Sequence, residues 1–225
     1  MLWVSKFGIA NGQATEDSPW VGAYPDPNRG EDSSDLYVIV QPALPGSEEF
    51  CADLRNAIGE TFHKKKMSLT GGLLGAVKAA HENLREWNGR SLREHQIGAG
   101  VSLLAVRARE AYLGQAGPAS AVYYRDFAAT EIVPTLPEAQ GPLGVVDEVW
   151  PQFTRYDLVN GDRFVILTPG LTAKIGEEAL AETLQLPPDL ALKDLFRRLR
   201  EETLCGAVLI AVEPEPAQPG SGTAP

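Results

Sequence analysis

The stretch Leu158–Leu171, LVNGDRFVILTPGL, is the part of the chain that decides the fold most directly. A polar turn, Asn160-Gly161-Asp162, leads into the apolar run Phe164–Leu167. Asn-Gly and Gly-Asp are strong turn signals, and Phe-Val-Ile-Leu is typical of a buried strand. The chain then breaks at Thr168-Pro169-Gly170 before a helical pattern begins. The stretch therefore predicts a core strand whose C-terminal end opens onto a loop, where function often resides.

Apolar patterning predicts further strands on both sides of this segment. Residues 1–34 are rich in turns and contain two short strand candidates, Trp3-Val4 and Trp20-Val21. Clear strands are expected at Leu36–Val40, Val101–Val106, Ala111–Gly114, Ala121–Tyr124 and Ala207–Val212. Thr154–Leu158 and Phe164–Leu167 are expected to form a hairpin across the Asn-Gly-Asp turn. Residues 130–150 predict irregular loop with short strands.

Two pairs of helices separate these strands. The first helix is expected from Ser47, a good N-cap, to about Lys66, with apolar residues at every fourth position. The second follows Ser68-Leu69-Thr70 and ends near Gly89. Its apolar stripe consists of Leu73, Val77, Ala80, Leu84 and Trp87. In the later pair, one helix spans Glu177–Leu184, and Asp189 caps the other after two prolines.

The order of these elements predicts an α+β fold with largely antiparallel sheet. Helix pairs at two places can cover the outer faces of two packed sheets, so a helix–sheet–sheet–helix arrangement is one option. We expect one domain over residues 1–212. Residues 213–225, EPEPAQPGSGTAP, have almost no large apolar side chains and predict a disordered tail or a linker.

The composition and net charge of the chain argue against some classes of binding partner. The chain has 225 residues, 44% hydrophobic and 22% charged, with a formal net charge of −10 and a pI of about 4.8. This acidity argues against nucleic acid, because phosphate binding needs clustered Lys and Arg. The basic run Lys64-Lys65-Lys66 is interpreted as a solvated helix end. The sequence has no apolar run long enough to span a bilayer and no signal-peptide pattern, so we expect a cytoplasmic protein.

The other reactive side chains form no recognisable catalytic pattern. The histidines, His63, His81 and His95, lack the spacing of metal ligands. Ser102 and Ser120 lie in or beside strands without a nucleophile elbow, and the acids Asp147-Glu148 are interpreted as a solvated turn. The two cysteines, Cys51 and Cys205, predict reduced, mostly buried thiols.

Several segments together resemble the type 2C metal-dependent protein serine/threonine phosphatases. Leu158–Leu171 is similar to the family pattern L..GD.lll.SDGL.d, and Gly117–Arg125, GPASAVYYR, is similar to GDSRaYlyR. Further similar segments are Ala14–Ser18, Leu36–Val40, Gly98–Val106 and Ala207–Val212. The resemblance covers about residues 10–212. It implies a four-layer αββα sandwich with two mostly antiparallel sheets flanked by helix pairs.

The resemblance also implies a binuclear Mg²⁺ or Mn²⁺ centre held by aspartates, which this chain lacks at the matching positions. The four aspartates fall at Gln41 or Pro42, at Pro118, at Pro169 and at about Leu204. The arginine that holds phosphate falls at Gly12. Only Glu16 and Asp17 remain, as a weak cation site or a solvated turn. Proline and leucine side chains cannot coordinate these ions, so we expect no catalytic residue, no metal site and no cofactor.

Three hypotheses follow. The first is a pseudophosphatase that acts as a regulatory module and binds a protein partner or a fused domain. The second is a divergent Mg²⁺- or Mn²⁺-dependent phosphatase with a relocated metal site that uses Glu16, Asp17, Asp35 or Asp53, and it requires these acids to converge in one cleft. The third is a purely structural or assembly domain.

Overall fold

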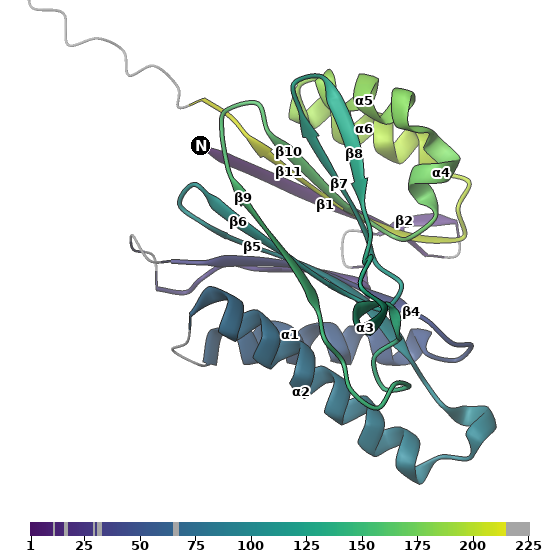
Figure 1. Cartoon of the computed structure of the whole chain (residues 1–225). Coiled ribbons are helices and arrows are strands. Elements are labelled where there is room, and N and C mark those ends of the chain that lie inside the picture. The colour runs from purple at the N-terminus through teal and green to yellow at the C-terminus, as the bar shows by residue number, and fades with distance from the viewer. Residues whose placement is uncertain (11, 16–17, 29, 31–32, 65–67, 215–225) are drawn as a thin grey trace, which may run out of the picture.

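The molecule consists of two packed β-sheets with helices on both outer faces (Figure 1). The computed structural model describes residues 1–10, 12–15, 18–28, 30, 33–64 and 68–214. The sequence of layers is helices, five-stranded sheet, six-stranded sheet, helices. This arrangement confirms the predicted α+β class and the αββα sandwich.

The five-stranded sheet has the order β3–β4–β5–β6–β9, and all its neighbouring strands are antiparallel. Its strands are β3 (Val21–Tyr24), β4 (Asp35–Pro42), β5 (Ala99–Arg107), β6 (Glu110–Ala116) and β9 (Gln152–Asp157). β4 and β5 are buried along nearly their whole length. Continuous apolar runs suit this central place, because both faces of each strand are covered.

The six-stranded sheet has the order β2–β1–β11–β10–β7–β8 and is also antiparallel. Its strands are β1 (Leu2–Ala10), β2 (Gln13–Thr15), β7 (Ser120–Arg125), β8 (Ala128–Ile132), β10 (Arg163–Leu167) and β11 (Leu204–Val212). β1 is much longer than the expected Trp3-Val4 strand. It pairs with β11 from Leu2 opposite Val212 to Ala10 opposite Leu204, so a long-range partner sets its length.

The helices divide between the two faces (Figure 1). α1 (Cys51–Lys64) and α2 (Leu69–Arg90) cover the five-stranded sheet, and a short 3₁₀ turn, Glu48–Phe50, precedes α1. On the six-stranded sheet lie α4 (Leu171–Ile175), α5 (Glu177–Gln185) and α6 (Pro188–Leu199). The remaining helical turns are α3 (Pro137–Gln140) and a 3₁₀ turn at Arg93–His95.

The side chains of β10 alternate between two hydrophobic cores. Phe164 and Ile166 belong to the core that includes the inner faces of both sheets together with α1 and α2. Val165 and Leu167 belong to the core under α5 and α6. Successive side chains of a strand point to opposite faces, so one apolar run can supply both cores. The Phe164–Leu167 run is therefore buried on both sides, as predicted.

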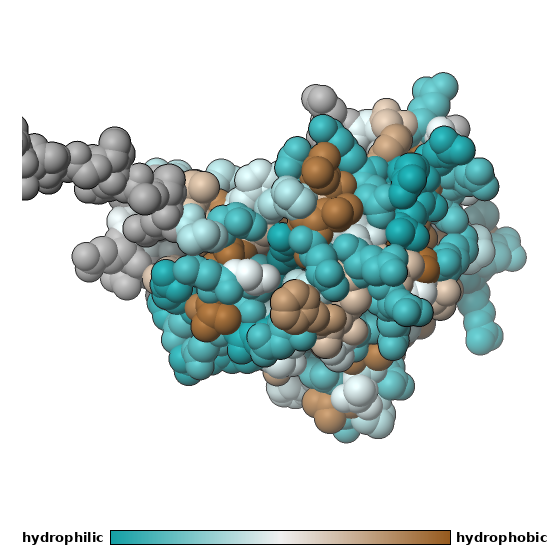
Figure 2. Space-filling model, turned by 90° about the horizontal axis from the view of Figure 1, so that it is seen from above, coloured by the Kyte–Doolittle hydropathy of each residue, from teal (hydrophilic) through white to brown (hydrophobic). Residues whose placement is uncertain are grey.

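The outer surface has no dominant apolar face from above. Seen from that side, most of the surface is hydrophilic and the apolar side chains lie in separate patches (Figure 2). Scattered exposed apolar residues are normal on folded proteins. In the described part of the chain, no helix has the length and apolar character needed to cross a membrane.

The predicted hairpin across Asn160-Gly161-Asp162 is wrong. β9 pairs with β6 in one sheet, whereas β10 pairs with β7 and β11 in the other. The turn therefore carries the chain between sheets. Gly161 has φ +95° and donates its N–H to the Val212 carbonyl at 2.7 Å. The Asn-Gly signal locates a turn but does not determine which strands pair across it.

Both predicted helix caps, Ser47 and Asp189, are also wrong. Ser47 has helical backbone angles, and its Oγ accepts a hydrogen bond from the Gly98 N–H at 3.0 Å instead of capping α1. Asp189 lies in the first turn of α6, after Pro187 at the N-cap position. Ser68 is the N-cap of α2, because its Oγ accepts a hydrogen bond from the Gly71 N–H.

The apolar stripe of α2 is buried except at its last member. Leu73, Val77, Ala80 and Leu84 are buried, whereas Trp87 is 49% exposed. Its ring packs on Phe50 with 4.8 Å between the ring centroids. The helix period therefore predicted the correct face but not the depth of burial at the helix end.

Candidate functional site

Strand ends from both sheets meet at one end of the sandwich, at the positions where the resemblance expects metal ligands. We call Gly12, Gln41, Pro42, Pro118, Pro169 and Leu204 the strand-end cluster. Gln41 and Pro42 end β4 opposite the start of β5, and Pro118 lies in the β6–β7 turn. Pro169 follows β10, and Leu204 begins β11.

Main-chain contacts join these ends. The Thr168 N–H donates to the Gly206 carbonyl at 3.1 Å, and the Gly206 N–H donates back to the Thr168 Oγ1 at 2.9 Å. The Gly12 N–H donates to the Thr203 carbonyl at 3.3 Å. The end of β10 and the start of β11 thus lie beside the β1–β2 turn.

Two glycines allow this close approach. A Cβ on Gly100 of β5 would lie 1.9 Å from the Pro118 carbonyl oxygen, so the β6–β7 turn packs directly on the β5 backbone. A Cβ on Gly206 of β11 would lie 2.6 Å from a methyl group of Val21, which belongs to the other sheet. Neither position can accept a side chain without local movement.

The strand-end cluster presents neutral groups. Pro42, Pro118, Pro169 and Leu204 are all half-buried and have no side-chain donor or acceptor. Gln41 is buried, and its Oε1 atom has no hydrogen-bond partner. Mg²⁺ and Mn²⁺ prefer several anionic oxygens, and one amide oxygen does not fit a binuclear centre. In the described ranges, no three His, Cys, Asp or Glu residues gather as a potential metal site.

The acids of the relocated-site hypothesis do not converge where they are described. Asp35 begins β4, at the opposite end of the strand from Gln41, and its Oδ1 accepts a hydrogen bond from the Asp26 N–H at 2.9 Å. Asp53 is exposed in the first turn of α1. Glu16 and Asp17 lie outside the described residues.

One pair of residues from the matching segments does come together. Arg125 ends β7, in the segment similar to GDSRaYlyR, and Asp162 is the aspartate of the Gly-Asp pattern. The Arg125 Nε lies 2.7 Å from the Asp162 Oδ1, and one terminal nitrogen lies 2.5 Å from its Oδ2. The Val159 N–H also donates to this carboxylate, at 2.8 Å. The carboxylate of Asp162 is buried, so the pair fixes the crossing between sheets.

Comparison with known proteins relates this architecture to one group of enzymes. No family model matches the chain, and no curated protein matches it in sequence. Solved structures do match. The S. agalactiae serine/threonine phosphatase superposes with a TM-score of 0.77 at 13% identity, covering 95% of this chain and 100% of that one. The chain has the type 2C phosphatase fold.

Two further neighbours with this fold are informative. PppA, titled a key regulatory component of T6SS in Pseudomonas aeruginosa, has a TM-score of 0.72 at 16% identity, covering 93% of this chain and 97% of that one. The catalytic domain of the phosphatase PstP, solved with two manganese ions, has a TM-score of 0.67 at 17% identity, covering 95% and 100%. At such identities the type 2C likeness establishes the fold alone, and activity depends on the residues at the site.

The remaining titratable and nucleophilic side chains hold the type 2C scaffold together. The Ser102 hydroxyl donates to the Ser120 carbonyl at 3.3 Å, and the Ser120 hydroxyl donates to Glu131 at 2.7 Å. The His63 Nε2 lies 3.0 Å from the Tyr24 carbonyl, and His95 is exposed on the 3₁₀ turn after α2. None of these contacts places a serine hydroxyl beside a histidine.

The cysteines are free and buried, which confirms the predicted burial. Burial raises the pKa of the Cys51 thiol to about 12 and that of Cys205 to about 11. Nucleophilic thiols need a lowered pKa, so these two are structural.

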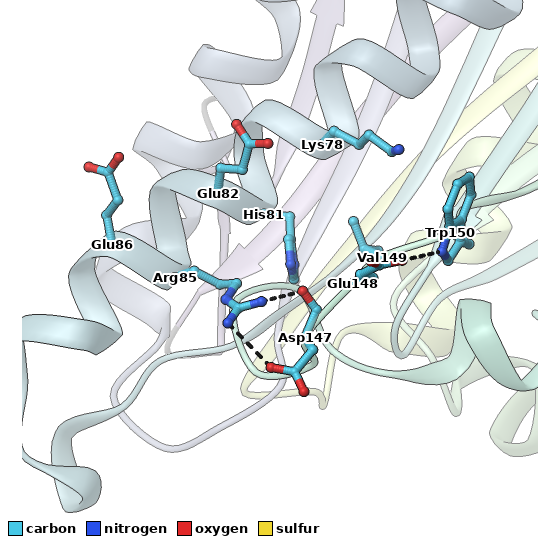
Figure 3. Close-up of a pocket in the computed structure, with 9 residues that line it drawn as sticks. All are labelled: Lys78, His81, Glu82, Arg85, Glu86, Asp147, Glu148, Val149 and Trp150. Carbon is cyan, nitrogen blue, oxygen red and sulfur yellow. Dashed lines mark hydrogen bonds and ion pairs between the residues drawn. The ribbon is translucent and has the colours of Figure 1, made fainter.

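A groove lies beside α2 (Figure 3). One wall comes from α2 and the other from the segment that leads into β9. We call it the α2 groove; it encloses about 540 Å³. It is lined by Lys78, His81, Glu82, Arg85, Glu86, Asp147, Glu148, Val149 and Trp150.

Polar contacts fix the second wall against α2. Arg85 donates to the carbonyl of Asp147 and, at 3.3 Å, to its carboxylate (Figure 3). The Asn88 amide nitrogen donates to the carbonyls of Ile97 and Gly144 at 2.8 and 2.9 Å. The wall is therefore held in place in the folded chain.

His81 is buried at the base of this wall. The Gly144 N–H donates to the His81 Nδ1 at 3.1 Å, which requires the ring to be unprotonated at that nitrogen. Burial lowers the pKa of His81, and the nearby Asp147 carbonyl opposes this with a smaller effect. The Nε2 atom faces that carbonyl without hydrogen-bond geometry. His81 is thus a neutral anchor.

The sequence interpretation missed the α2 groove. Asp147-Glu148 were interpreted as a solvated turn, and both are indeed exposed. Their position beside Trp150 was the available signal, because a tryptophan in an acidic loop is costly to expose without a binding role. The opposing acids on α2 are distant in sequence, so the groove itself was not predictable.

Proposed function

We propose that this chain is a type 2C phosphatase-fold domain that has lost metal-dependent phosphate hydrolysis and acts by binding, as a regulatory module for a protein partner or a fused domain. The observation that carries the proposal is the strand-end cluster. At the place where the fold would hold its metal ions, the side chains are prolines, a leucine and a neutral glutamine. These side chains do not fit the ions, so no hydrolytic step is assigned to this chain.

The retained parts of the matching segments support the proposal. The Arg125–Asp162 pair and the two sheet cores preserve the scaffold. Metal-dependent phosphoryl transfer needs cations that neutralise charge on the phosphate and activate water. The chain therefore retains the fold but lacks the residues for metal-dependent phosphoryl transfer. This combination is expected when a fold is selected for binding. A cytoplasmic location belongs to the same proposal.

The direct test is hydrolysis of p-nitrophenyl phosphate and of a phosphothreonine peptide in Mn²⁺. The purified chain and its Glu16→Ala/Asp17→Ala double variant are compared. We expect both to show the same background rate. Metal-dependent turnover that survives repurification and disappears in the double variant would overturn the proposal and support the relocated-site enzyme.

A further inference from the structure

We propose that the α2 groove binds a basic peptide segment of a protein partner, with a lysine or arginine of that segment held against Trp150 and the surrounding carboxylates. This inference goes beyond the proposed function. Hydrolytic activity at the strand-end cluster would refute that function and leave the groove proposal standing.

The charge of the groove is the first argument. Four carboxylates line it, from Glu82, Glu86, Asp147 and Glu148, against the two cations Lys78 and Arg85, and Arg90 just outside the lining lies 3.9 Å from Glu86. The guanidinium of Arg85 is already committed to Asp147. Glu82 is exposed on α2 and makes no ion pair with any described residue. The groove therefore has unneutralised negative charge on a chain whose net charge is −10.

Trp150 is the second argument. Its side chain is 48% exposed in a concave surface, and its indole N–H donates to the Glu148 carboxylate at 3.1 Å. A tryptophan face attracts cations, and the Lys78 Nζ already lies 4.2 Å from the ring centroid. Lys78 shows that an ammonium group fits over this ring, and it acts as an internal competitor for a partner's cation.

Rigidity is the third argument. The bonds from Arg85, Asn88 and His81 hold the second wall on α2 without a ligand. A preformed groove loses less conformational entropy when a ligand binds, so less of the interaction free energy is offset. An exposed aromatic in a fixed pocket is also the usual anchor of a protein interface. An anionic ligand is disfavoured, because it would face four carboxylates.

The test is fluorescence anisotropy with two labelled peptides on the full chain. One peptide alternates glycine with arginine, and the other has glutamate in place of arginine. We expect only the arginine peptide to bind, with affinity that falls as salt rises. Equal binding of the glutamate peptide, or no binding of the arginine peptide, would overturn the proposal.

Variants locate the binding. Trp150→Ala should weaken it by about tenfold, whereas Trp150→Phe, which keeps an aromatic face, should retain most of it. Lys78→Ala should tighten binding by about threefold, because the internal competitor is removed. Lys193→Ala, an exposed lysine on α6, should change nothing.

Two matched glutamate substitutions distinguish binding in the α2 groove from a non-specific attraction of the basic peptide to an acidic protein. Glu82→Gln should weaken binding by about threefold, while Glu178→Gln on α5 should leave it unchanged. Equal effects of these two substitutions, or full binding by Trp150→Ala protein with an unaltered circular dichroism spectrum, would overturn the proposal.

Discussion

At the scale of single residues, the Arg125–Asp162 ion pair stabilises the type 2C fold. Asp162 is 1% exposed and accepts hydrogen bonds from Arg125 and from the Val159 backbone. The Arg125 side chain is 36% exposed, so solvent screens part of its attraction to Asp162. The pair lies at the turn where the chain crosses between sheets.

Removal of one partner of this pair should destabilise the fold. For Asp162→Asn we expect a loss of about 2–3 kcal/mol in the free energy of unfolding, because Arg125 loses its carboxylate and a buried hydrogen-bond network is broken. Urea denaturation measures this loss. Arg125→Gln should cost much less in the Asp162→Asn background than alone. Additive effects would contradict a direct coupling.

His81 should make stability depend on pH in a defined direction. Burial lowers the pKa of His81 in the folded chain, so the unfolded chain binds a proton more readily. Stability is therefore fully present above the ordinary histidine pKa of about 6.5 and falls as pH drops below it. The charged groups around the ring are Arg85, Glu82 and Asp147.

The measurement is the urea midpoint at pH 7.5 and pH 5.5 for the natural chain and for His81→Gln. The substitution should lower stability at pH 7.5 and reduce the decline towards pH 5.5. His95→Gln, at an exposed position, is the control and should keep the full decline. An unchanged pH dependence in His81→Gln protein would show that this ring does not carry the effect.

At the scale of elements, the closest packing lies where the β6–β7 turn meets β5. Gly100→Ala should destabilise the chain by several kcal/mol or displace the turn, because the new methyl group would overlap the Pro118 carbonyl. Gly75→Ala on α2 is the matched control, since no atom lies within 4 Å of a Cβ there. We expect it to stabilise the helix by about 0.5–1 kcal/mol. Thermal melts that rank the two variants in the opposite order would contradict this packing.

Most elements were predictable because their signals are local. Phe164–Leu167 and Leu36–Val40 are apolar runs, and α2 has a periodic apolar stripe, so the local sequence of each element is enough to predict it. The partners of β9 and the length of β1 were not predictable, because pairing with β6 and β11 depends on residues far away in sequence. Ser47 failed as a cap for the same reason, since its hydroxyl bonds to Gly98.

The site was predictable to a different degree. The positions of the strand-end cluster followed from the family resemblance, and the fold brings those strand ends together. The α2 groove did not follow, because its acids come from a helix and a loop that are joined only by tertiary contacts. Local sequence patterns predicted the strand ends, and only the fold could reveal the α2 groove.

At the scale of the whole molecule, the chain has the fold of the type 2C phosphatases. The residues of its strand-end cluster, however, include no carboxylate. A solved neighbour with this fold holds two manganese ions, whereas Gln41, Pro118 and Pro169 stand here at the strand ends that the family resemblance matches to metal ligands. Loss of one ligand could be compensated by water. Loss of the whole carboxylate set, as we propose for this chain, would remove the charge that holds two divalent cations together.

The most direct measurement is calorimetric titration of the chelator-treated chain with Mn²⁺. The account predicts no heat beyond dilution, because the strand-end cluster offers no anionic cage. Saturable, tight uptake of about two ions would contradict the account and show that carboxylates elsewhere in the chain form the centre.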